Sequence, residues 1–424
     1  MPEARPLPHP IIKFDDALGR RIVNTHIWAV REGLRGAAAE ALFDGYCQRL
    51  VADGVPLWRS QTAMETLHPQ WSGYGYTWRR DLNAIQPMQF EHNVEADPMW
   101  IQSPFFELIR RAKAGDDEPS LRRRLSEGPA QRDFPVLEEF FSLGATDYLC
   151  RLYSFGEAGD PSQGTGVVYS FTSDRRDGFS ESDLTLIDAT LPALSLAMKS
   201  DAGHVIASSL LGAYLGADAG RRVHSGAVQR GSVSSIRAAL WYADIRGFTA
   251  TSDAAPGATI VALLNDVFET LTAPLRSRGG QVLKFIGDAV LATFPLEEGD
   301  VAETCVRALD AAHEAARGLA ALNATRATAG LPAAEVDIAL HVGEVLYGNV
   351  GAIDRLDFTV IGPAVNEVTR IEALCEPLGR RVVVSADFVA AMGDDARLES
   401  LGRHVLRGVR EPKSIFALPV AAGA

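Results

Sequence analysis

The sequence has few cysteines and lacks the segments that would direct a chain into or across a membrane. Its cysteines show no metal-ligand spacing, so we expect buried, reduced thiols in a cytoplasmic protein; they are Cys47, Cys150, Cys305 and Cys375. The first six residues hold no apolar core of a signal peptide. The nearest candidate for a membrane span, Val205 to Gly216, is too short. We therefore expect no membrane span.

Several common functional signatures are also missing. The net charge is −13 and no long basic block occurs, which argues against a general nucleic-acid binder. Neither a Walker A motif nor Gly-x-Gly-x-x-Gly is present, so the common nucleotide-binding folds are not indicated. His313-Glu314 has no second histidine at the spacing of a zinc protease.

A chain of 424 residues predicts about two or three domains. We assign 1–200 to an N-terminal regulatory domain, 201–235 to a helical junction, and 236–424 to a catalytic domain. Residues 1–16 are expected to form a mobile tail.

The N-terminal part alternates helical and strand-like patterns. We expect one helix over 31–51, a charged and solvated helix or loop over 110–133, and a helix from Glu181 with Ser180 as its N-cap and a kink at Pro192. Strands are expected at 74–78, 148–154 and 167–171, with a loop at 156–166. The aromatic residues of 57–80 favour core packing over a ligand pocket. The order of helix, antiparallel strands and closing helix resembles a GAF-type sensor domain of the α/β class.

The junction is expected to hold a short helix that Gly216 ends, followed by a small hairpin or turn at 222–231. The C-terminal part then follows a β-α-β-β-α-β order, which predicts an α+β, ferredoxin-like antiparallel sheet with helices on one side. A Gly-rich turn is expected at Gly348–Gly351. The expected strands are 237–244, the hairpin 281–294, 335–346, 358–361, 381–385 and 415–418, and the expected helices are 257–276, 301–327 and 363–374, with Pro274 able to end the first of these early.

Two carboxylates stand at positions suited to metal binding. Asp288 occupies the Gly-Asp turn of the hairpin 281–294, and Asp244 ends the preceding strand. Such a pair can chelate the Mg²⁺ ions that clamp an in-line phosphoryl displacement. The turn at Gly247 leads into Phe248 and Thr249, whose backbone N–H groups could cradle a polyphosphate. Asp288 alone could equally be an ordinary turn residue, but Lys284 in the same apolar strand is harder to explain without a partner.

Residues 236–418 resemble a class III nucleotidyl cyclase catalytic domain. The resemblance rests on five motifs in register, which are Ala243-Asp-Ile-Arg-Gly-Phe-Thr249, Lys284-Phe-Ile-Gly-Asp288, Gly348-Asn-Val-Gly351, Asp357-Phe-Thr-Val-Ile-Gly362 and Asn366-Glu-Val-Thr-Arg370. It implies conversion of ATP to 3′,5′-cyclic AMP and pyrophosphate, a phosphorus–oxygen lyase activity. It also implies two Mg²⁺ or Mn²⁺ ions per site, held by Asp244, Asp288 and the backbone of Ile245.

The resemblance assigns further roles on the substrate side. Asn366 and Arg370 would orient the ribose and neutralise the α-phosphate in the transition state. Lys413 would bind the triphosphate, and Arg355 would act similarly from the partner chain. Lys284 and Thr359 occupy the purine-specifying positions, where guanylyl cyclases carry Glu and Cys-like residues. Lysine can donate to adenine N1 and threonine can accept from the 6-amino group.

The resemblance also raises hypotheses about regulation and assembly. A Lys/Thr pair is similar to the bicarbonate-stimulated subgroup, so bicarbonate is one candidate effector, and a small-molecule ligand of 1–200 is another. Pro363 departs from the polar residue of relatives and could alter the purine pocket. Because the family shares each site between two subunits, we expect a head-to-tail homodimer. Two alternatives stay open, a guanylate cyclase and a degenerate module that binds nucleotide without catalysis.

Overall fold

The computed structural model of the chain describes residues 16–82, 84–92, 97–155, 166–393, 397–409 and 411–418. The chain divides into two compact units, Met1–Leu210 and Leu211–Ala424. The division falls inside the segment that we predicted as a junction. The predicted tail and nearly all of the predicted loop at 156–166 lie outside the described residues.

The N-terminal unit is built on one six-stranded antiparallel sheet in the order β3-β2-β1-β6-β5-β4. Its strands are β1 (Leu57–Glu65), β2 (Trp71–Arg79), β3 (Ala84–Glu91), β4 (Ser120–Arg124), β5 (Asp147–Tyr153) and β6 (Val167–Ser173). Its helices are α1 (Ala17–Leu34), α2 (Ala39–Ala52), α3 (Pro98–Ile101), α4 (Pro104–Lys113), α5 (Pro135–Ser142) and α6 (Glu181–Leu215), with 3₁₀ turns η2 (Leu125–Glu127) and η3 (Pro129–Gln131).

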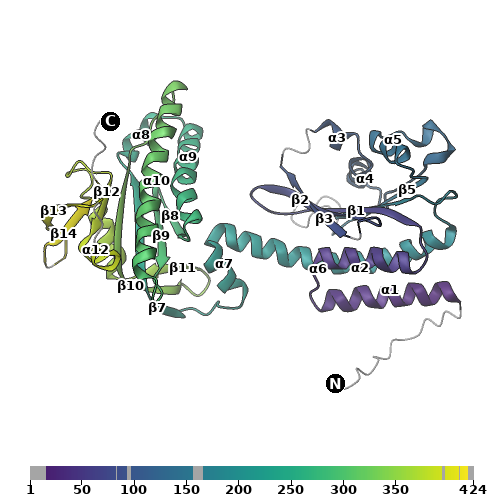
Figure 1. The fold of residues 1–424 in the computed structure, drawn as a ribbon, viewed down its shortest axis with the longest axis horizontal. Helices are drawn as coiled ribbons and strands as arrows, with labels where there is room; N and C mark the ends of the chain where they lie inside the picture. The colour runs from purple at the N-terminus through teal and green to yellow at the C-terminus, as the bar shows by residue number, and fades with distance from the viewer. Residues whose placement is uncertain are drawn as a thin grey trace, which may run out of the picture. The chain divides into compact units, whose positions relative to one another are not determined.

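Both faces of this sheet are covered by helices, as Figure 1 shows. Buried side chains of α2 and α6, such as Leu42 and Leu191, form one core with Phe171 of the sheet. Leu108 of α4 and Leu137 of α5 form a second core on the other face. The predicted order of helix, antiparallel strands and closing helix is present, while the resemblance to a GAF-type domain stays a prediction.

Several expectations for the N-terminal half and the junction need correction, while the start of the closing helix is as expected. The helix expected over 31–51 is interrupted, because α1 ends at Leu34 and Gly36 adopts a positive φ of 73° before α2 begins. The charged segment 110–133 contains a strand, β4, whose Arg122 pairs with a buried carboxylate. Helix α6 begins at Glu181 as expected, and the Ser180 hydroxyl accepts a hydrogen bond from the Asp183 N–H at 3.2 Å.

The same helix runs unbroken past Pro192 to Leu215. The short helix expected before Gly216 is therefore the last turns of α6. In the same junction, the hairpin or turn expected at 222–231 begins within another helix, α7 (Ala217–His224). The four cysteines are buried and free, as expected.

Asp147 is a buried carboxylate that joins two parts of the N-terminal unit. It accepts hydrogen bonds from Arg122 Nη2 at 2.7 Å and from the Phe179 N–H at 3.0 Å. Replacing it by alanine leaves Arg122 with only the Phe179 carbonyl and the exposed Glu181 at 3.8 Å, so Asp147→Ala should lower the free energy of unfolding by about 3–5 kcal/mol. Asp188→Ala is the matched control, because the Arg151–Asp188 pair is more exposed and should contribute under about 1 kcal/mol. Chemical denaturation measures both, and equal losses would contradict this account.

The C-terminal unit is built on a sheet in the order β13-β14-β12-β10-β7-β9-β8, with β11 paired to β10. Its strands are β7 (Val233–Ile245), β8 (Gln281–Ile286), β9 (Ala289–Pro295), β10 (Val336–Gly351), β11 (Leu356–Ile361), β12 (Val382–Ser385), β13 (Glu399–His404) and β14 (Lys413–Ala417). Its helices are α7, α8 (Phe248–Ala254), α9 (Gly257–Ser277), α10 (Val301–Thr328), α11 (Pro363–Glu372) and α12 (Ala386–Met392).

Helices cover both faces of this sheet, so the expectation of helices on one side was wrong. Buried side chains of α9, α10 and α12 pack with Trp241 of β7 in one core. On the other face, Val368 and Ile371 of α11 and Ala219 of α7 pack around Leu240. Figure 1 shows α9 and α10 side by side along the sheet. The α+β class and the mixed succession of strands and helices are as predicted.

Two local expectations in this unit also fail. Residues Gly348–Gly351 belong to the long strand β10 and form no turn. A Cβ at Gly348 would lie 2.2 Å from the Ser232 carbonyl oxygen, so glycine is required there by the close approach of the chain leading into β7. Strands β10 and β12 pair in parallel, so the sheet is not wholly antiparallel.

Helix α9 is long and apolar enough to cross a membrane by length and composition. Its apolar residues Leu263, Val267, Leu271 and Leu275 are buried in the core against the sheet. The helix also continues past Pro274 to Ser277, later than expected. Core packing in this unit therefore accounts for its composition.

Candidate active site

Two carboxylates come together at one end of the central strands. Asp244 is the penultimate residue of β7, and Asp288 lies in the turn between β8 and β9, which Gly287 enters with φ 63°. Ladder pairing of Ala243 with Val290 brings the end of β7 alongside that turn. The hairpin predicted from the sequence is thus present, and its register places Asp288 beside Asp244.

The protonation of Asp244 is affected by its burial and by Asp288. Burial raises the pKa of Asp244 to about 6, and the Asp288 carboxylate contributes to this rise by hydrogen bonding and by repulsion. Asp244 Oδ1 is buried and has no hydrogen-bond partner among the described residues. The pair therefore lacks a counter-cation within the part of the chain that the structure describes.

Further acids surround this pair, and we did not predict them from the sequence. Asp337 is the ladder partner of Asp244 on β10, but Arg246 neutralises it through hydrogen bonds of 2.9 and 2.6 Å. Glu372, at the end of α11, has its pKa raised to about 7 by burial and then by Asp244 and Asp337. Its place directly after Arg370-Ile371 on the helix that packs against β7 was the available signal.

This donor set fits a divalent cation. An orphaned, buried carboxylate oxygen beside a second carboxylate is the arrangement that a hard cation such as Mg²⁺ or Mn²⁺ satisfies. Ile245, which ends β7, directly follows Asp244 in the chain, so its backbone carbonyl lies close to the pair. The residues predicted as metal ligands are therefore adjacent in space.

The raised pKa of Asp244 predicts a pH-dependent stability. An acid whose folded pKa lies above its unfolded value of about 3.9 binds more protons when folded, so the folded state loses stability as pH rises from about 4 to about 6. Asp244→Asn removes this penalty. In metal-free buffer at pH 7.5, it should raise the free energy of unfolding by about 1–2 kcal/mol after discounting for solvent screening.

At pH 4 the same substitution should have little effect, because Asp244 is then protonated. Asp253→Asn is the control, since Asp253 is an exposed acid on α8. Thermal unfolding at the two pH values measures the difference, and an equal effect of Asp244→Asn at both would contradict the assignment.

The predicted base-reading lysine has a partner that was not predicted. Lys284 Nζ forms an ion pair with Asp357 of β11, and both side chains are half exposed. Thr359, the other predicted purine residue, follows two positions later on the same strand. The structure thus brings β8 and β11 together, and Asp357 joins the predicted pair. Its position two residues before Thr359, on the same side of a strand, was the signal that could have found it.

Helix α11 carries the two residues predicted to stabilise the transition state. Asn366 is exposed on the first turns, and Arg370 is half-buried, with its guanidinium near Gly408 of the segment between β13 and β14. Spacing of four residues puts both on one helix face, as expected. No described hydrogen bond or ion pair joins either side chain to Asp244 or Asp288.

Lys413 lies in a charged cluster that the sequence did not reveal. Its ammonium lies 3.0 Å from Glu367 Oε1 and 3.4 Å from Asp387 Oδ2. Beneath them His341 is buried, and its Nδ1 is 2.9 Å from the Ser385 hydroxyl. His341, Glu367 and Asp387 are spaced closely enough to hold a metal ion, but the Lys413 cation already pairs with both carboxylates.

Of the remaining predicted residues, Thr249 and Arg355 are exposed and Phe248 packs partly against the core. Phe248 and Thr249 begin α8 directly after Gly247, whose φ of 67° makes the turn that was expected there. Arg355 is exposed, and its carbonyl oxygen accepts a hydrogen bond from the Ala352 N–H at 2.9 Å.

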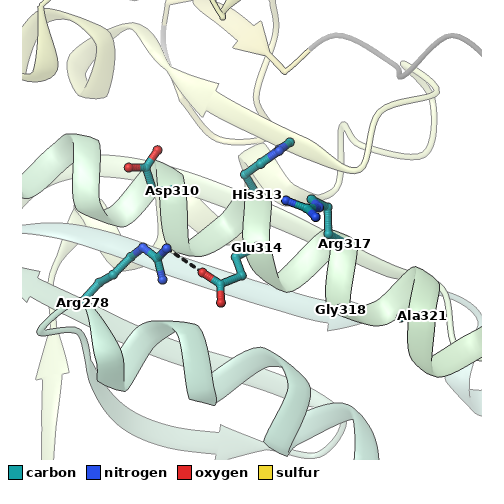
Figure 2. A pocket seen from close by; sticks show the side chains of 7 residues that line it. All are labelled: Arg278, Asp310, His313, Glu314, Arg317, Gly318 and Ala321. Atoms are coloured by element: carbon teal, nitrogen blue, oxygen red, sulfur yellow. Dashed lines mark ion pairs between the residues drawn. The ribbon is translucent and has the colours of Figure 1, made fainter.

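A separate surface depression of about 480 Å³ lies on the outer side of α10. Figure 2 shows that its charged side chains come from α10 and from the end of α9, where Arg278 pairs with Glu314 at 2.5 Å. Asp310 likewise pairs with Arg397 at 2.5 Å. Helix α10 packs on one face of the sheet, whereas Leu240 and Tyr242 of β7 pack on the other. Asp244 alternates to the same face as Leu240 and Tyr242, so this depression is not part of the carboxylate site.

Comparison with known proteins assigns the C-terminal unit. The family model described as "Adenylate and Guanylate cyclase catalytic domain" matches residues 232–419. Residues 232–419 belong to this family of class III nucleotidyl cyclase domains. The adenylate cyclase of Anabaena cylindrica is 35% identical over 166 residues, which cover 38% of this chain and 32% of that protein. Adenylate cyclase 1 of Rhizobium meliloti is 30% identical over 169 residues, 39% of this chain and 25% of that protein.

Among solved structures, a bacterial light-regulated adenylyl cyclase matches with a TM-score of 0.45 and 24% identity, over 54% of this chain and 63% of that one. The matched segment spans about a third or less of the two curated relatives. Class III cyclase domains generally use divalent metal ions, and the family membership of this cyclase domain was predicted from its five motifs.

Proposed function

We propose that this chain is an adenylate cyclase that converts ATP to 3′,5′-cyclic AMP and pyrophosphate. The observation that carries the proposal is the Asp244–Asp288 pair, whose orphaned oxygen lacks a cation among the described residues. The names of the curated relatives, both adenylate cyclases, support the choice of adenine over guanine. Lys284 supports it as well, because an ammonium can donate to adenine N1.

Asp244, Asp288 and the Ile245 carbonyl would hold two Mg²⁺ or Mn²⁺ ions. Bound there, such ions lower the pKa of the ribose 3′-hydroxyl and neutralise the phosphates during in-line displacement. The surrounding residues of the chain would position the substrate. Phe248 and Thr249 offer backbone N–H groups at the start of α8 for the polyphosphate.

The substrate side of the site would come from β8, β11, α11 and β14. Lys284 and Thr359 would contact the purine, with Asp357 orienting the lysine. Asn366 would hold the ribose, and Arg370 would stabilise the charge that develops on the α-phosphate. Lys413 would exchange its present carboxylate partners for the triphosphate.

A head-to-tail homodimer would complete each site. Within one chain, no described hydrogen bond or ion pair links the carboxylate pair to Asn366, Arg370 or Lys413, so two chains can each contribute one set. Exposed apolar side chains on β8, β10 and β11 favour such a contact near the site; these are Phe285, Ile286, Leu346 and Ile361. Arg355, exposed directly before β11, would reach the partner's triphosphate.

Other parts of the proposal rest on the sequence. The N-terminal unit would regulate catalysis through α6 and α7, in answer to a small-molecule ligand, and the protein would act in the cytoplasm. Bicarbonate is a candidate effector, which a flat activity curve against bicarbonate at fixed pH would dismiss. A guanylate cyclase is the second candidate, because the family description covers both activities.

Mixed dimers test the shared site. Asp288→Ala and Asn366→Ala should each reduce cyclic AMP formation from Mn²⁺-ATP by about 100-fold or more, because each removes a group that acts on the transition state. Co-expressed, the two variants should recover about a quarter of wild-type activity, since one of two sites is intact in half of the dimers. Asp253→Ala is the control and should retain full activity. No recovery in mixed dimers would refute the shared site, and no cyclic AMP from the wild type would refute the proposed function.

Asp357 offers a second test, directed at the purine. Without its carboxylate partner, Lys284 should be less well positioned, so Asp357→Asn should raise KM for ATP about 3–10-fold with a smaller change in kcat. Asp354→Asn is the matched control, because Asp354 is an exposed acid just before β11. Steady-state kinetics with ATP and GTP measure the effect; an unchanged KM would remove Asp357 from the purine site.

A further inference from the structure

An arginine on the sheet of the N-terminal unit has no carboxylate partner among the described residues. Arg59 of β1 donates a hydrogen bond from Nη2 to Gln61 Oε1 at 3.3 Å, and its guanidinium carbon lies 5.1 Å from the Phe140 ring centroid. Burial lowers the pKa of Arg59, and the charge of Arg79 lowers it further, while the exposed Glu139 acts in the opposite direction from beyond ion-pair distance. These are the properties of a half-buried cation whose charge is not balanced locally.

Neighbouring strand arginines show what Arg59 lacks. Each of four others on this sheet donates two hydrogen bonds to one carboxylate, in the two-pronged geometry that guanidinium groups favour. The pairs are Arg79–Asp81, Arg122–Asp147, Arg123–Asp133 and Arg151–Asp188. Among the described residues, the side chain of Arg59 bonds only to the amide oxygen of Gln61, at a longer distance, and to no carboxylate. The two parallel N–H groups of its guanidinium are therefore available to a carboxylate from outside the chain.

A second polar side chain without a complete set of partners lies beside Arg59. Thr172 of β6 is its ladder partner, so both side chains lie on the same face of the sheet. Thr172 is only 1% exposed, and its Oγ1 has no hydrogen-bond partner among the described residues. A buried hydroxyl without a partner is costly, and it is expected where a ligand or ordered water completes the structure.

We propose that Arg59 and Thr172 form a binding site for the carboxylate of a small organic acid, whose apolar body lies against Phe140. Helices α4 and α5 cover this face of the sheet (Figure 1), and Trp58 lies edge-on to Phe140 at 6.3 Å. The guanidinium fork of Arg59 would donate two hydrogen bonds to the carboxylate, and the Thr172 hydroxyl would donate a third. The aromatic wall favours an apolar acid over an inorganic anion. This site is independent of the chemistry proposed for the C-terminal unit.

Ligand-induced stabilisation of the full chain tests the site with defined probes. Benzoate and hexanoate present a carboxylate on an apolar body, and benzamide and hexanamide present the same bodies without charge. At least one acid should raise the Tm of the transition assigned to the N-terminal unit in a saturable way, and its amide should not. Tryptophan fluorescence reports binding to the same unit, because Trp58 adjoins the site.

Three variants separate the site from general stabilisation by salt. Arg59→Gln should weaken binding of the acid about tenfold or more, since a charge-assisted pair is lost. Arg80→Gln is the matched control, because Arg80 already pairs with Asp174 at the surface, and it should bind the acid like the wild type. Thr172→Val should raise the Tm without ligand, because it removes the unpartnered hydroxyl, and should reduce the shift that the acid produces.

Arg59→Lys keeps the positive charge but loses the two parallel N–H donors of the guanidinium. It replaces Arg59→Gln in the test if that variant does not fold, and its binding of the acid should again be about tenfold weaker. The proposal is overturned if neither acid gives a saturable shift in the wild type. Equal affinity in the wild type and in the Arg59 variants would overturn it as well.

Discussion

The proposed chemistry of the C-terminal unit depends on two carboxylates that the fold holds side by side. The ladder between β7 and β9 and the tight turn at Gly287 bring Asp288 to Asp244, where each acid destabilises the other. Burial, and after it the Asp288 carboxylate, raises the pKa of Asp244 to about 6. One oxygen of Asp244 is also left without a partner among the described residues. Folding energy from the two cores on either face of the sheet offsets this repulsion. A divalent cation would turn the same arrangement into a stable chelate.

Three other charged groups near the site already have partners of opposite charge within the chain. Asp337 is neutralised by Arg246, Lys284 by Asp357, and Lys413 by Glu367 and Asp387. The lysine assigned to the triphosphate therefore has carboxylate partners that ATP would have to replace, whereas Asp357 would remain to orient Lys284. The Asp244–Asp288 pair differs in having no such partner among the described residues, which is why the proposed metal chemistry is centred there.

The sequence was most informative where function depends on local motifs. Gly287-Asp288 predicts a turn, and five motifs in register predict the cyclase family, because both signals lie in contiguous residues. Contacts between distant strands were less accessible: Asp357 as the partner of Lys284 depends on the approach of β11 to β8, and the Lys413 cluster depends on α11, α12 and β14 meeting. We did not predict that helices cover both faces of the sheet, that the first helix breaks at Gly36, or that β10 continues through Gly348. Packing and the close approach of backbone segments determine these features, and local periodicity does not report either of them.

Binding of Mn²⁺ measured by electron paramagnetic resonance, on the full chain with a non-hydrolysable ATP analogue, tests the central claim most directly. We expect two bound Mn²⁺ ions per site in the wild type, and loss of this binding in both Asp244→Asn and Asp288→Asn with the fold retained. Unchanged Mn²⁺ binding in these two variants would contradict the assignment of the carboxylate pair as the metal site.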